Sequence, residues 1–66
     1  MNILLNNKPE ILLKGSTIRK LLENKNIKNK YYAIEINGKI IPKSNHETYV
    51  IKDGDSIEIV TAIGGG

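Results

Sequence analysis

The 66-residue sequence contains no cysteine, no tryptophan and no phenylalanine, and its single histidine is His46. The lack of cysteine excludes a disulfide staple, a thiolate zinc site and a nucleophilic thiol. One histidine is too few for a multi-histidine metal site. No apolar run approaches the roughly 20 residues that a bilayer-spanning helix needs. Met1 leads directly into strand-like sequence without a charged-then-apolar leader, so we expect one soluble cytoplasmic domain, monomeric on its own, that binds no membrane.

Positive charge is concentrated in the first half of the chain. Residues 1–33 carry seven basic and two acidic side chains, whereas residues 34–66 carry three basic and five acidic ones. A nucleic-acid-binding protein would place such lysines on phosphates and would usually add exposed aromatic side chains for stacking. No known binding motif surrounds the lysines, so we interpret them as a solvated surface and expect no nucleic-acid partner. The acidic half suits docking against a basic protein surface.

Turn residues and alternating apolar residues divide the chain into strands and one helix. The spacing of Ile18, Leu21 and Leu22 predicts a short helix, capped by Ser16 or Thr17 and ending near residues 24–26. The other elements follow from alternation between turn signals, and strands are predicted at 2–5, 10–13, 31–36, 39–42 and 56–60, with a short extended piece at 49–51.

Three turns fix the order of these strands. The first is predicted over residues 6–9, the second at Asn37-Gly38, and the third at residues 53–55, where Gly54 can adopt a positive φ. One helix can cover only one face of the sheet, so the fold class is α+β, with a mixed four- to five-stranded sheet around one helix. This element order is that of the ubiquitin-like β-grasp, in which the first and last strands are parallel neighbours. We expect a β-grasp domain at residues 1–60 and a flexible tail at 61–66.

Alternation also predicts which side chains face the helix. The covered face is expected to hold Ile3, Leu5, Ile11, Leu13, Ile34, Ile36, Ile57 and Ile59. The open face is expected to hold Leu4, Leu12, Ala33, Glu35, Glu58 and Val60. Leu4 and Val60 would lie on neighbouring central strands and form a contiguous apolar patch that leads into the tail. We interpret this patch as a docking surface for a partner protein.

No catalytic group of residues is present in the sequence. His46 has no nucleophile to serve and polar neighbours, which is typical of a surface loop. Asp53 and Asp55 flank a glycine and indicate a turn, since no further carboxylate follows at the spacing of a calcium loop. We therefore expect no bound metal, no cofactor and no catalytic residue in this chain.

The three terminal glycines are the most informative feature. Glycine has no Cβ, so Gly64, Gly65 and Gly66 can thread through a channel too narrow for other residues. Six residues from Thr61 reach at most about 20 Å, far enough to place Gly66 inside a partner's active site while the domain docks outside. A carboxylate becomes a good electrophile once ATP adenylates it. The ATP site must belong to another enzyme, because the glycines precede no helix that would bind phosphate.

The sequence resembles the ThiS family, the sulfur carrier proteins of thiamine biosynthesis. The resemblance covers the whole chain and depends most on four segments, which are residues 37–42, the turn 53–55, the strand 57–60 and the terminal Gly65-Gly66. It implies a protein that is a substrate of enzymes and not itself an enzyme. A ThiF-type enzyme would use Mg and ATP to adenylate Gly66, and sulfur from a cysteine desulfurase relay would convert it to a thiocarboxylate. A ThiG-type thiazole synthase would consume that sulfur.

Two alternatives remain open at this point. A MoaD-type carrier of molybdopterin synthesis shares the fold and the chemistry, but such proteins are usually longer and tend to have an aromatic-rich first strand. A β-grasp binding module with an inert terminus would tolerate extension beyond Gly66, whereas a carrier would not.

Overall fold

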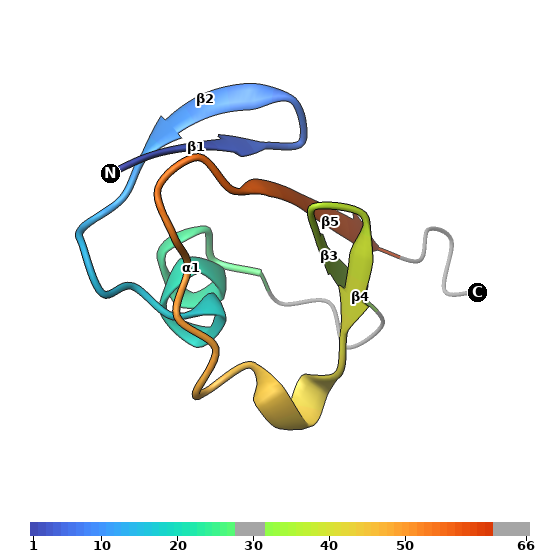
Figure 1. Ribbon diagram of the computed structural model, residues 1–66. Helices are drawn as coiled ribbons and strands as arrows, with labels where there is room; N and C mark the ends of the chain where they lie inside the picture. The colour runs from blue at the N-terminus through green and yellow to red at the C-terminus, as the bar shows by residue number, and fades with distance from the viewer. Residues whose placement is uncertain (28–31, 62–66) are drawn as a thin grey trace.

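The computed structural model describes residues 1–27 and 32–61. These residues form five strands, one α-helix and one short 3-10 helix (Figure 1). The elements in chain order are β1 (Asn2–Leu5), β2 (Lys8–Ile11), α1 (Ile18–Asn24), β3 (Tyr32–Ile36), β4 (Lys39–Ile41), η1 (Lys43–Asn45) and β5 (Ser56–Thr61). The predicted extended piece at residues 49–51 forms only an isolated bridge, between Thr17 and Val50.

The strands make one mixed sheet in the order β2-β1-β5-β3-β4. β1 and β5 run parallel at its centre, and the remaining pairs are antiparallel. Helix α1 covers one face of this sheet (Figure 1). The β-grasp arrangement predicted from the sequence is therefore confirmed.

Helix α1 begins where the sequence predicts. The Thr17 hydroxyl accepts a hydrogen bond from the backbone N–H of Lys20, as expected of a residue that caps a helix N-terminus. Ser16 takes another role, because its hydroxyl donates to the carbonyl of Leu13. The apolar side of the helix is completely buried at Ile18 and Leu21. It packs with the inward side chains of the sheet into one aliphatic core, which holds Ile3, Leu5, Leu12, Ile18, Leu21, Leu22, Ile34, Ile36, Ile51 and Ile57.

Strand β2 lies two residues earlier than predicted. Asn6 and Asn7 alone form the turn, with φ values of 49° and 66°. Such left-handed pairs are typical of two-residue hairpin turns, and asparagine tolerates them. The short turn places Ile11 opposite Asn2 and Pro9 opposite Leu4.

This shift reverses the predicted faces of residues 11–13. Directly opposite residues of an antiparallel pair share a face, so Ile11 lies on the open face with Leu4. Ile11 and Leu13 are 79% and 81% exposed, whereas Leu12 is buried. The prediction was wrong for all three residues, because it assigned four residues to a turn that contains two.

His46 is buried, contrary to the prediction of a surface loop. It follows η1, and its Nε2 lies 3.0 Å from the carbonyl oxygen of Ile41, to which only an N–H can donate. The His46 ring stacks on the Tyr32 ring, with 6.0 Å between their centroids. Lys43 Nζ lies over the same Tyr32 ring, 4.6 Å from its centroid. The histidine therefore anchors the segment between β4 and β5 and is not available at the surface.

Candidate functional site

Strand β5 is the last described element of the chain and lies in the middle of the sheet. It is paired with β1 on one side and with β3 on the other. Its last residue, Thr61, lies opposite Tyr32, and Val60 lies opposite Ala33. The residues that precede the tail are therefore held by a neighbouring strand to the end of β5. The predicted tail residues Gly64, Gly65 and Gly66 lie outside the described residues.

The predicted docking residues Leu4 and Val60 are both exposed on the open face. Their exposed fractions are 42% and 52%, and their strands are neighbours, as expected. Their predicted contiguity is wrong, however, because the parallel register pairs Leu4 with Ser56. Val60 lies four residues further along β5, which is about 13 Å at the usual rise of a strand. Alternation could assign the face, but it could not assign this register.

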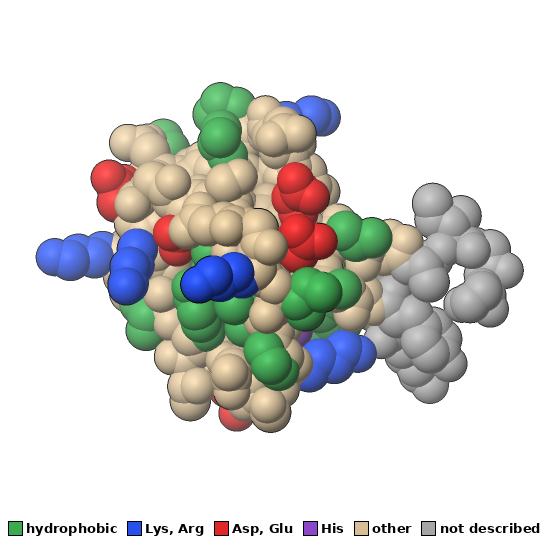
Figure 2. Space-filling model, turned by 45° about the vertical axis from the view of Figure 1, so that its right-hand side comes forward, with side chains coloured by type: hydrophobic (Ala, Val, Ile, Leu, Met, Phe, Trp, Pro, Cys, Tyr) green, Lys and Arg blue, Asp and Glu red, His purple; other side chains and the backbone are tan. Residues whose placement is uncertain are grey.

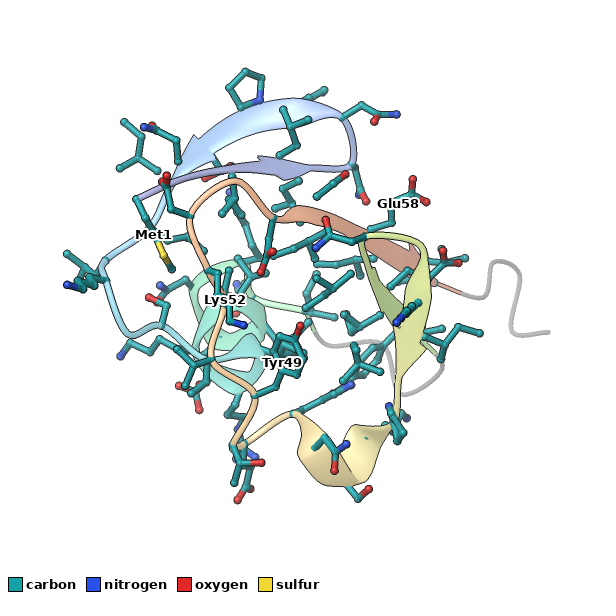
Figure 3. All side chains as sticks on the ribbon, viewed as in Figure 1. Met1, Tyr49, Lys52 and Glu58 are labelled. Atoms are coloured by element: carbon teal, nitrogen blue, oxygen red, sulfur yellow. The ribbon has the colours of Figure 1, made fainter. Side chains whose placement is uncertain are left out.

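The open face therefore carries two separate apolar groups. The β1–β2 group consists of Leu4, Pro9 and Ile11, and the β5–β4 group consists of Val60, Ala33 and Ile40. Between the two groups Glu58 projects from β5 (Figure 3). Figure 2 shows acidic side chains beside hydrophobic ones on this side of the molecule. The β5–β4 group is the nearer of the two to the end of β5.

Two exposed members of these groups were not predicted to lie on the open face, since Ile11 was assigned to the covered face and Ile40 to neither. Ile11 and Ile40 are 79% and 68% exposed. A two-residue turn determines the face on which each isoleucine lies. The Asn6-Asn7 turn places Ile11 opposite Asn2. The Asn37-Gly38 turn places Ile40 opposite Glu35. The residues of the turns were therefore the signal that could have located both isoleucines.

The aspartates of the turn before β5 have structural roles. Asp53 Oδ1 accepts a hydrogen bond from the N–H of Asn2 at 2.7 Å. Asp55 is buried and accepts from Asn37 Nδ2 and from the N–H of Lys52. Gly54 between them has a φ of 86°, as the sequence predicted. In the described part of the chain, no three His, Cys, Asp or Glu side chains come close enough together to hold a metal ion.

A surface hollow of about 540 Å³ lies away from the end of β5. Met1 and Lys52 border it (Figure 3), and the completely buried Ile51 contributes to its lining. Of the predicted site residues that the structure describes, neither Leu4 nor Val60 contributes to it. Among the described residues, no helix has both the length and the apolar character needed to cross a bilayer.

The comparison with protein families identifies the chain. Residues 3–66 match the model of the ThiS family. The chain belongs to the ThiS family. The match includes all three glycines of the tail as well as the β-grasp domain.

Individual relatives support the assignment to ThiS. The chain is 32% identical to the sulfur carrier protein ThiS of Escherichia coli over 66 residues, which is the full length of both proteins. It is also 33% identical over 66 residues to a thiazole synthase of Paramagnetospirillum magneticum, of which it spans only 20% of the length.

Solved structures agree with the fold. The crystal structure of the thiamine biosynthesis protein ThiS from Geobacter metallireducens superimposes with a TM-score of 0.86, at 28% identity and full coverage of both chains. The NMR solution structure of a thiamine biosynthesis protein from the same organism gives a TM-score of 0.81, covering all of this chain and 88% of the other.

Proposed function

We propose that this ThiS-family chain is a sulfur carrier whose C-terminal residue, Gly66, is converted to a thiocarboxylate. The observation that carries the proposal is the family match, which continues from strand β1 through the tail to Gly66. The full-length similarity to the sulfur carrier protein ThiS of Escherichia coli supports the same function. In this proposal the chain is a co-substrate of enzymes and performs no catalysis itself.

The chemistry would take place in partner enzymes. An oxygen of the Gly66 carboxylate attacks the α-phosphorus of ATP, pyrophosphate leaves, and an acyl-adenylate results. A sulfur nucleophile then attacks the acyl carbon and expels AMP. If the sulfur arrives as a persulfide, a thiol must cleave the remaining S–S bond to leave the thiocarboxylate. A ThiF-type enzyme would supply the ATP and Mg site, and a cysteine desulfurase relay would supply the sulfur.

The thiocarboxylate sulfur would then be donated to the thiazole of thiamine by way of a ThiG-type synthase. A thiazole synthase of another organism contains a segment similar to this chain, which supports such a partnership. The position of β5 also fits this role, because this central strand ends at Thr61, only a few residues before the glycines in the sequence. Gly64 and Gly65 would thread into the partner's active site, and the effect of the third glycine can be measured on a chain that ends in two glycines instead of three.

The open face is the proposed docking surface. Leu4 and Val60 are its predicted members, and Ile11 and Ile40 enlarge the two apolar groups to which they belong. Helix α1 covers the opposite face, so docking here would leave the core undisturbed. Val60 is the closest of the four to the tail along the chain and should contribute most to positioning Gly66.

The test is the intact mass of the protein after incubation with ATP, Mg²⁺, a ThiF-type enzyme and a sulfur donor. We expect a shift that corresponds to replacement of one oxygen by sulfur, localised to Gly66 by fragmentation. The matched control is the chain with one residue added after Gly66, which should fold and remain unmodified. An unchanged wild-type mass in the presence of an enzyme that loads its own carrier would refute the proposal.

A further inference from the structure

Two carboxylates face each other across the open side of the central strands. Glu58 of β5 lies directly opposite Glu35 of β3 in the antiparallel register. Directly opposite residues have Cβ atoms only about 4.5–5.5 Å apart, and like charges in this position destabilise a sheet. The domain therefore carries an electrostatic cost at the middle of its uncovered face.

All the other Asp and Glu side chains, which lie within residues 1–27 and 32–61, have a partner. Glu10 pairs with Lys25, and Glu23 and Glu47 both pair with Arg19. Asp53 and Asp55 accept the hydrogen bonds described above. Glu35 and Glu58 have neither an ion pair nor a hydrogen bond from their side chains to any described residue. The two unpartnered acids are thus the two that lie side by side.

Their surroundings are those of a protein interface. Ile40 lies on the far side of Glu35, and Val60 follows Glu58 on the same face of β5. Both side chains are more than half exposed. When a partner covers such apolar side chains, water leaves and the interaction of the carboxylates with an opposite charge becomes stronger.

We propose that Glu35 and Glu58 together receive an arginine or lysine side chain of the activating enzyme. This inference rests on the proposed function, because it assigns a specificity to the same docking surface. A single cation between the carboxylates relieves their repulsion and satisfies both acids at once. The pair therefore favours partners with a basic residue on an apolar surface and accelerates their encounter with the carrier.

The experiment measures adenylation of the full-length carrier by a ThiF-type enzyme, as pyrophosphate release at several carrier concentrations and at two ionic strengths. The test variant is E35Q/E58Q. The matched control is E23Q/E47Q, which removes the same number of charges from the Arg19 ion pairs on the helix side. A third variant, E58R, creates a cation opposite Glu35 within the chain itself.

For E35Q/E58Q we expect KM to rise about tenfold at low salt, with a smaller rise at high salt and kcat within about twofold of wild type. Its Tm should increase by roughly 1–5 °C, because the repulsion is gone. E58R should raise KM further, whereas E23Q/E47Q should leave KM within about twofold. A less effective carrier that is also a more stable protein distinguishes a docking role from damage to the fold.

Three results would overturn the inference. These are an unchanged KM for E35Q/E58Q, an equal rise for E23Q/E47Q, or a loss confined to kcat. If wild-type carrier is loaded normally, these results leave the sulfur-carrier function intact and remove only the role of the glutamates. If wild-type carrier is not adenylated by an enzyme that loads its own carrier, the proposed function fails, and the inference fails with it.

Discussion

Asp55 holds the β3–β4 turn against the start of β5, and replacing it tests this link directly. Its carboxylate accepts hydrogen bonds from Asn37 Nδ2 at 3.0 Å and from the N–H of Lys52 at 2.9 Å. Asn37 in turn accepts a bond from the N–H of Ser56 through its Oδ1. Both partners of Asp55 are donors, so each carboxylate oxygen must act as an acceptor. The substitution Asp55→Asn preserves the shape but leaves one acceptor for two donors.

The expected loss follows from this count. One hydrogen bond to a charged group contributes about 1.5–3 kcal/mol, and the donor left behind is partly buried. A domain of this size has a total stability of about 3–10 kcal/mol. We therefore expect Asp55→Asn to remove a large share of it and to lower Tm by roughly 6–20 °C.

Asp53→Asn is the matched control. Asp53 accepts a single bond, from the N–H of Asn2, so an asparagine oxygen can replace the carboxylate oxygen. We expect this variant to lose less than about 1 kcal/mol. The assay is urea unfolding followed by far-UV circular dichroism, since the chain has no tryptophan to serve as a fluorescent probe. If Asp55→Asn is no less stable than Asp53→Asn, the hydrogen-bond account of this turn is refuted.

Further predictions concern the core and one turn. Ile57 is completely buried on the central strand, so Ile57→Ala should cost about 2–5 kcal/mol of unfolding free energy in the same urea assay. Ile11→Ala, at an exposed position, should stay within about 0.5 kcal/mol of wild type, and equal losses would contradict the assigned faces. Gly54→Ala places a Cβ where φ is 86° in otherwise open space, so backbone strain alone should cost about 1–2 kcal/mol in thermal unfolding, whereas a neutral result would refute the strain.

The fold was predictable where the deciding information is local. Alternation assigned β1, β3 and β5 to the correct faces, and Asn37-Gly38 specified its hairpin. The error at β2 was also local, because Asn6-Asn7 is a complete two-residue turn and the residues after it already belong to the strand. Reading that pair of asparagines as the whole turn would have placed Leu12 inside and Ile11 outside.

The site was less predictable because it depends on strands that are distant in sequence. Leu4 and Val60 were assigned to the correct face, but a parallel pair separated by some 50 residues has no turn that sets its register. The opposition of Glu35 and Glu58 arises in the same way, since β3 and β5 are not consecutive. The burial of His46 likewise requires the ring of Tyr32 from another element. For the strand residues alternation gives the face, and only the packed sheet gives the neighbour.

The two-sided pairing of β5 explains how the domain tolerates the repulsion that the proposed interface requires. A like-charge pair on an edge strand would favour fraying of that strand, but β5 is held by β1 and β3 and is fixed below by Ile57. The repulsion therefore lowers the free energy of unfolding of the whole cooperative domain, by about 0.2–1 kcal/mol, and does not loosen β5 locally. The same charges on edge strand β4 should instead increase local opening of that strand. In the variant I40E/E58Q the like-charge pair is Glu35 and position 40 of β4. Amide hydrogen exchange in β4 of this variant should be faster than exchange in β5 of the wild type. Equal exchange in the two strands would show that central placement gives no such protection.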